Sequence, residues 1–217
     1  MLLKAMVTLP LAIILSQAMA QKPKPYRCGW VDNDTAQLSK TYHTNLKYWG
    51  AQKGETIASV GAQNGSLEVR LALYRDSLTC TLQDIDSSCL NQQEFDKVLQ
   101  YYQALANKKI NSQFQLVLGT PYQTNLPARK YHRILLINVY HELTQKRAIL
   151  NQLHTALLPD GVLVVMERMG NKEGKKRKDC HHIMPYEPTF IAEFKQCQFE
   201  LQSKTIVKNL SYYTFVS

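Results

Sequence analysis

Several familiar signatures are missing from this sequence, and each absence argues against a class of protein. No Cys-x-x-Cys pair occurs, and no cysteine or histidine spacing is typical of a zinc site. No Gly-x-Ser-x-Gly motif is present, which argues against a serine hydrolase. The sequence has no internal repeat, and beyond residue 20 it has no apolar run long enough to span a bilayer. These absences leave one folded domain with no metal site and no membrane span as the expectation.

The N-terminus has the composition of a secretory signal peptide. Lys4 supplies a positive charge, Ala5–Leu15 is mostly apolar, and Ala18-Met19-Ala20 forms a small-x-small cleavage site before Gln21. A buried N-terminal helix is the alternative interpretation. The sequence therefore predicts a signal peptide over residues 1–20 and a periplasmic or secreted protein. Of the 217 residues, 45% are hydrophobic, and residues 21–217 suit a single domain with its own core.

The cysteines are compatible with export, because disulfides form in oxidising compartments. Their number is odd, so at least one must be free or must pair between chains. Cys80 lies in an apolar run and is expected to be a small buried residue. The sequence leaves the pairing open. The five cysteines are Cys28, Cys80, Cys89, Cys180 and Cys197.

The chain is basic, with a formal charge of +9, and the positive charge is densest over Lys172–Lys178. Such a cluster indicates either contact with an anionic surface or a solvated loop after a strand. No stacking aromatics are interleaved with these lysines, so a nucleic-acid partner is not expected.

Hydrophobic periodicity predicts an α/β domain over residues 34–217, preceded by a loose lead-in at residues 21–33. An initial helix begins near Asp34 or Thr35 and ends before Gly50. Strands and helices then alternate, which favours a mostly parallel sheet with helices on both faces. Two final strands are joined by too short a link for a helical crossover, so they should form an antiparallel hairpin. The expected strands are 56–60, 78–82, 114–118, 133–139, 162–166, 199–207 and 212–216, and the later helices are 66–74, 91–105, 145–157 and 189–196.

Ligands of open parallel sheets bind beyond the carboxyl ends of the strands, which directs attention to the first two turns. Gly61 and Gly65 flank the first turn, where a backbone without Cβ atoms can bend tightly and approach a ligand. A simple tight turn is the alternative. Asp84 and Asp86 end the second strand, where a carboxylate can accept hydrogen bonds from a ribose diol. A solvated aspartate that caps the next helix is equally compatible with the pattern.

These elements resemble the class I S-adenosylmethionine-dependent methyltransferases, over nearly all of residues 21–217. Ile57–Gly65 looks like the family's first motif, and Asp84 falls at its ribose-binding acid. Lys130–Leu143 is similar to the fourth strand and following segment, Leu158–Leu163 is similar to the turn into strand five, and the final hairpin matches the family's reversed seventh strand. The resemblance implies a Rossmann-like seven-stranded sheet and S-adenosylmethionine as cofactor. The implied cofactor-binding residues are Gly61, Gln63, Gly65, Asp84, Thr120 and Asn138.

The sequence departs from the family pattern at three positions. Ser59 stands where the family usually has Asp or Glu, Gln63 replaces the middle glycine, and Thr120 replaces the adenine-side acid. Each change removes a polar contact or adds bulk beside the expected cofactor. A catalytically silent domain that binds a ligand or a partner is therefore an alternative to an active enzyme, and a nucleotide-dependent oxidoreductase is a further one.

His141 and Glu142 follow the fourth strand, near the expected position of the transferred methyl group. We predict His141 to be a general base or a donor that orients the acceptor, with Glu142 beside it. A histidine that packs or caps at the loop is the alternative. The sequence does not identify the methyl acceptor, which is a small molecule or a protein. His181 and His182 are adjacent and diverge in direction, so they are not expected to share a metal ion.

Overall fold

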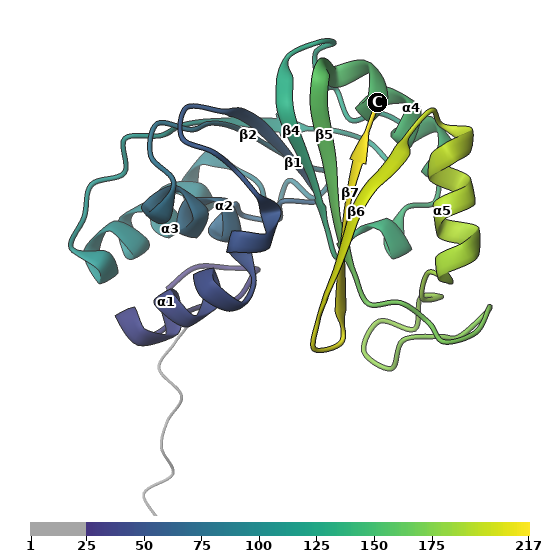
Figure 1. The fold of residues 1–217 in the computed structure, drawn as a ribbon. Helices are drawn as coiled ribbons and strands as arrows, with labels where there is room; N and C mark the ends of the chain where they lie inside the picture. The colour runs from purple at the N-terminus through teal and green to yellow at the C-terminus, as the bar shows by residue number, and fades with distance from the viewer. Residues whose placement is uncertain (1–24) are drawn as a thin grey trace, which may run out of the picture.

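A computed structural model describes residues 25–217 (Figure 1). The expected signal peptide, residues 1–20, lies outside the described residues. None of the helices within the described part of the chain is long and apolar enough to cross a membrane.

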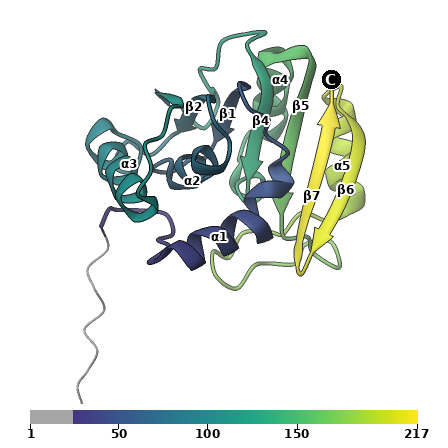
Figure 2. The same ribbon diagram turned by 60° about the vertical axis from the view of Figure 1, so that its left-hand side comes forward.

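The core of the structure is a seven-stranded sheet in the order β3-β2-β1-β4-β5-β7-β6. The first five strands are parallel, whereas β7 runs antiparallel to both β5 and β6. Figure 2 shows the β6–β7 hairpin at one edge of the sheet. The expected fold class is therefore confirmed, including the terminal hairpin. The strands are β1 (Thr56–Val60), β2 (Thr79–Asp84), β3 (Gln113–Leu118), β4 (Tyr131–Ile137), β5 (Leu157–Glu167), β6 (Glu200–Val207) and β7 (Leu210–Val216).

Helices cover both faces of the sheet and enclose two hydrophobic cores. On one face lie α1, α2 and α3, and on the other lie α4 and α5 (Figure 1). Central strand residues such as Ile134 and Leu135 point to opposite cores and are fully buried, which explains why β4 is apolar on both faces. The helices are α1 (Thr35–Thr44), α2 (Ser66–Tyr74), α3 (Gln92–Ala106), α4 (Lys146–Ala156) and α5 (Glu187–Gln196), with short 3₁₀ turns at Leu46–Trp49 and Tyr140–Glu142.

Several element boundaries differ from the sequence prediction, and the differences in α1, β4 and β5 are the most informative. The first helix ends at Thr44, and a separate 3₁₀ turn follows it. Strand β4 ends at Ile137 because Asn138 adopts a left-handed conformation, with φ of 55°. Strand β5 begins at Leu157, so the Pro159-Asp160-Gly161 segment is an irregularity within the strand and not a turn before it. The register shift beside Tyr131 accommodates these extra residues.

The described part of the expected loose lead-in is fastened to the domain. Cys28 forms a disulfide with Cys89, which follows β2. Tyr26 is buried, and its hydroxyl lies 2.8 Å from the Tyr102 hydroxyl of α3. Asp32 forms a 2.9 Å ion pair with Arg70 of α2. These contacts attach the segment to α2, to α3 and to the loop between β2 and α3. The other three cysteines, all among the described residues, are unpaired, and Cys80 is buried as expected.

Candidate functional site

A cavity of about 900 Å³ opens at the carboxyl ends of β1, β2 and β4. The chain leaves β1 toward β2 on one side, whereas β4 lies on the other side, so this is the switch point of the sheet. The cavity volume lies within the range of sites for small molecules and cofactors. Six of the sequence-predicted residues line it: Gly61, Gln63, Asp84, Thr120, Asn138 and Glu142.

Gly65 and His141 are not part of the cavity wall. Gly65 has a φ of 76°, and a Cβ placed there would lie 2.4 Å from Leu82 Cδ1. The missing side chain therefore lets the turn pack onto the core of the domain. His141 lies behind the wall, with a side chain that is only 1% exposed. Their predicted roles in cofactor binding and catalysis stay predictions.

The turn after β1 is shaped by its neighbours as well as by its glycines. Gly61 has a φ of 74°, and a Cβ there would lie 2.5 Å from Val139 Cγ2, which belongs to the segment after β4. The Gln63 side chain is exposed, and its backbone N–H donates to Asp84 Oδ2 at 2.7 Å. This bond joins the first turn to the end of β2, so Gly61 and Asp84 face one crevice, as the sequence predicted.

The Asp84 carboxylate already accepts three backbone hydrogen bonds. Oδ2 accepts from Gln63, and Oδ1 accepts from Ile85 at 2.7 Å and Asp86 at 2.9 Å. A carboxylate has about four acceptor positions, so one remains, on Oδ2. Asp84 lines the cavity, which makes that position available to one ligand hydroxyl. Its main contribution is to hold the two turns in place.

Glu68 is a candidate residue that the sequence analysis missed. It lies in the first turn of α2, is only 1% exposed and lines the cavity. Ser59 Oγ, at the end of β1, donates to Glu68 Oε1 at 2.6 Å. Glu68 Oε2 is buried and has no hydrogen-bond partner within residues 25–217. Burial raises the pKa of Glu68 above its ordinary value, with the hydrogen bond from Ser59 acting in the opposite direction.

The pairing of Ser59 and Glu68 places a carboxylate beside the position where the methyltransferase family usually has an acid. Most residues of α2 are buried, Glu68 among them, so the pattern of apolar residues in this helix does not mark Glu68 as facing the cavity. Glu68 could have been found from one sequence signal: a serine at the end of the strand, followed by a glutamate in the first turn of the next helix. An unpartnered buried carboxylate oxygen is costly, so a cation bound at this wall of the cavity would stabilise the ionised form of Glu68.

Arg177 of the basic loop lines the same cavity and reaches the segment after β4. Its Nη1 donates to Asn138 Oδ1 at 2.7 Å and lies 3.1 Å from His141 Nε2. Asp179 holds the guanidinium through contacts of 2.9 Å and 2.6 Å, and this pairing keeps the pKa of Asp179 well below its ordinary value. The remaining basic residues of this loop are exposed, which is compatible with both a solvated loop and contact with an anionic surface.

His141 is oriented by a buried carboxylate. Its Nδ1 lies 3.0 Å and 3.1 Å from the two oxygens of Glu167, which ends β5 and is 0% exposed. The neutral tautomer that donates through Nδ1 leaves the Nε2 lone pair as the acceptor for Arg177. His141 can therefore act as a base only when the guanidinium moves away.

Comparisons with solved structures find proteins of the same fold. A S-adenosylmethionine-dependent methyltransferase from Aquifex aeolicus is similar with a TM-score of 0.62 at 14% identity, covering 85% of this chain and 98% of that chain. One from Methanosarcina mazei gives 0.58 at 12% identity, covering 79% and 95%. The O-methyltransferase NcsB1 from neocarzinostatin biosynthesis, solved with S-adenosyl-L-homocysteine and 1,4-dihydroxy-2-naphthoic acid, gives 0.60 at 16% identity, covering 85% and 56%.

No protein-family model matches the sequence, and the comparison with curated proteins finds no relative. Identities this low establish architecture only. The strand order, the reversed β7 and the likeness to these structures together show that the chain has the Rossmann-like fold of the class I S-adenosylmethionine-dependent methyltransferases.

Proposed function

We propose that this protein binds S-adenosylmethionine in the cavity at the switch point and transfers its methyl group to an acceptor. The observation that carries the proposal is the buried Glu68 carboxylate, which lines the cavity with Oε2 unpartnered. The cofactor contains an ammonium group, a sulfonium and a ribose diol, so it presents both cations and hydroxyl donors. Glu68 supplies an acceptor for the ammonium, and Asp84 retains one acceptor position for a ribose hydroxyl.

The residues of the chain would contribute mainly by positioning. The bound cofactor supplies an electrophilic methyl group, and catalysis then depends on holding an acceptor in line with it. The missing side chain at Gly61 lets the first turn pack against Val139, and Asn138 and Glu142 line the cavity from the segment after β4. The neighbour from neocarzinostatin biosynthesis was solved with a small aromatic acid, which supports a small-molecule acceptor for this chain.

A silent ligand-binding domain is the second candidate. Two observations favour it. Three of the acceptor positions of Asp84 already bind backbone N–H groups, and Arg177 donates to the lone pair of His141 Nε2. Both arrangements leave the cavity open, but they reduce the number of free acceptor positions on Asp84 and block the basic nitrogen of His141.

Calorimetric titration with S-adenosylmethionine and S-adenosylhomocysteine tests the proposal. We expect heat from binding to one site per chain, and no heat with NAD. The reason is that the Glu68 carboxylate matches the ammonium group of the amino-acid part of S-adenosylmethionine, which NAD lacks. No heat at about 1 mM ligand would correspond to binding weaker than about 4 kcal/mol and would contradict cofactor binding. Saturable binding of both ligands, without methyl transfer from S-adenosylmethionine to any small phenol or acid, would favour the silent domain.

We further propose that the protein is exported and processed. The signal-peptide pattern of residues 1–20 and the Cys28–Cys89 disulfide both support an oxidising compartment. The intact mass of protein purified from its native host should correspond to a chain that starts at Gln21 and has lost two hydrogens to one disulfide. A mass that includes residues 1–20, or one without the disulfide, would argue against export.

A further inference from the structure

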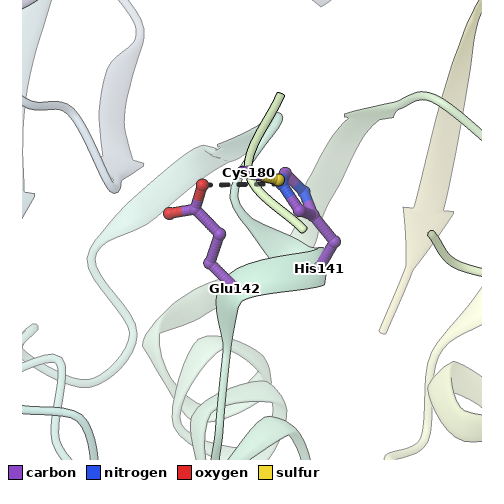
Figure 3. A group of neighbouring side chains, drawn as sticks. All are labelled: His141, Glu142 and Cys180. Carbon is purple, nitrogen blue, oxygen red and sulfur yellow. Dashed lines mark ion pairs between the residues drawn. The ribbon is translucent and has the colours of Figure 1, made fainter. Parts of the chain in front are cut away.

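Three potential metal ligands converge beside the cavity, where Glu142 forms part of the lining. His141 and Glu142 lie in the 3₁₀ turn after β4, and Cys180 lies in the basic loop. One ligand atom from each residue lies within 4.8 Å of the other two. Figure 3 shows the His141 ring, the Glu142 carboxylate and the Cys180 sulfur gathered together. Within this group, His141 Nε2 lies 3.5 Å from Glu142 Oε1.

His141 is already prepared as a ligand. The buried Glu167 carboxylate contacts Nδ1 and also accepts from the His141 backbone N–H at 3.2 Å. These contacts fix the ring and place the Nε2 lone pair toward the cluster. Metal-bound histidines almost always donate their second ring N–H to such a carboxylate, which raises the basicity of the ligating nitrogen. Glu167 is 0% exposed, and its function in this arrangement is to orient the His141 ring.

The cluster already accommodates a positive charge. Arg177 Nη1 lies 3.1 Å from His141 Nε2, so a guanidinium occupies the position that a ligated cation would take. Asp179 binds the same guanidinium, and both residues belong to the loop that carries Cys180. A metal ion and the Arg177 side chain therefore exclude each other, because both use the Nε2 lone pair.

The ligand set selects the metal. Nitrogen, carboxylate oxygen and thiolate sulfur together suit Zn²⁺, whereas Mg²⁺ and Ca²⁺ prefer oxygen alone. Usual zinc bond lengths place tetrahedral nitrogen and oxygen ligands about 3.4 Å apart, close to the observed His141–Glu142 distance of 3.5 Å. Cys180 lies on a loop of mostly exposed residues and would need to approach by on the order of 1 Å to reach zinc–sulfur bonding distance.

From this geometry we propose that His141, Glu142 and Cys180 form a Zn²⁺ site with a fourth position open, and that Arg177 competes with the metal for it. This inference differs from the sequence prediction, which included no metal ligand. It does not rest on the proposed methyltransferase function, because it concerns only side chains of this chain and a cation.

Zinc titration of the full chain against a chromophoric chelator tests the site. We expect one Zn²⁺ per chain in the wild type. Arg177→Met should bind at least about tenfold more tightly, because the competing guanidinium is gone, whereas Glu167→Gln should bind about tenfold to a hundredfold more weakly. Cys180→Ser should also weaken binding. His43→Gln removes an exposed histidine of α1 and serves as the control, with unchanged affinity expected.

Cobalt substitution gives a second readout that is independent of affinity. Co²⁺ in the wild type should produce a sulfur-to-cobalt charge-transfer band, and Cys180→Ser should abolish it. Because Cys180 lies in a loop and is only partly buried, this variant is expected to fold even if Glu167→Gln does not. Absence of stoichiometric zinc, equal affinity in Cys180→Ser, or no gain in Arg177→Met would each overturn the proposal.

Discussion

Glu68→Gln is expected to weaken binding of S-adenosylhomocysteine by about tenfold to a hundredfold. The carboxylate would form a charge-assisted hydrogen bond to the ligand ammonium, and such bonds contribute about 1.5–3 kcal/mol. Glutamine keeps the shape of the side chain and can keep the bond to Ser59, but it removes the charge. Calorimetry on both proteins measures the difference. Glu55→Gln is the matched control, because Glu55 pairs with Arg133 at the opposite end of β1.

The same variant should alter the pH dependence of binding. Burial raises the pKa of Glu68, so its carboxyl must lose a proton before it pairs with the ammonium. Affinity in the wild type should therefore rise with pH, by up to about tenfold per unit, and level off above the raised pKa. In Glu68→Gln this rise should be absent. An equal pH dependence in both proteins, or equal affinity at neutral pH, would exclude Glu68 from the binding site.

The stability of the free protein should change with pH in the opposite sense. An acid whose pKa is higher in the folded state than in the unfolded chain binds its proton more tightly when folded. The contribution of Glu68 to stability is therefore full below its ordinary pKa and is lost as the pH rises through the raised value. A cation in the cavity offsets this loss, which links ligand binding to the charge of one buried side chain.

Asp32→Ala is expected to lower the free energy of unfolding by about 3–5 kcal/mol. The Arg70 side chain is only 2% exposed, and its Nη1 contacts Asp32 Oδ2 at 2.9 Å. Without Asp32, the buried guanidinium keeps its charge and loses its counter-ion. It retains contacts to backbone oxygens of Ser66 and Trp30, which cannot neutralise it. Urea denaturation followed by circular dichroism measures the loss.

Asp34→Ala provides the matched control for that experiment. Asp34 is an exposed aspartate two residues away, and its Oδ1 accepts from the Gln37 N–H as the N-cap of α1. Removing a cap of this kind costs about 1 kcal/mol. Similar losses for the two variants would contradict the idea that the Asp32–Arg70 pair anchors the N-terminal segment to α2.

Much of the fold could be predicted from periodicity, because burial on a regular element leaves a regular pattern. The apolar run in β4 reflects a central strand whose residues enter both cores, and Leu38 and Tyr42 mark the buried side of α1. The site could be located because the carboxyl ends of parallel strands must meet at one edge. Gly61 and Asp84 were brought into one crevice by that rule.

The features that escaped prediction depend on contacts distant in sequence. Nothing local indicates that Cys28 pairs with Cys89, or that Arg177 folds back from a solvated loop onto His141. Periodicity also does not predict where the Glu68 side chain points. Glu68 lies in the first turn of α2, directly after the N-cap Gly65, and its carboxylate accepts a hydrogen bond from Ser59. Loops and element ends follow tertiary packing, so a sequence pattern does not specify them.

A crystal structure of the protein with S-adenosylhomocysteine is the most direct test of the central claim. We expect the nucleoside to lie in the cavity beyond β1, β2 and β4, with the ligand amino group hydrogen-bonded to Glu68 and a ribose hydroxyl hydrogen-bonded to Asp84. Ligand density elsewhere on the molecule, or a bound nucleoside that leaves the Glu68 carboxylate unpaired, would contradict it.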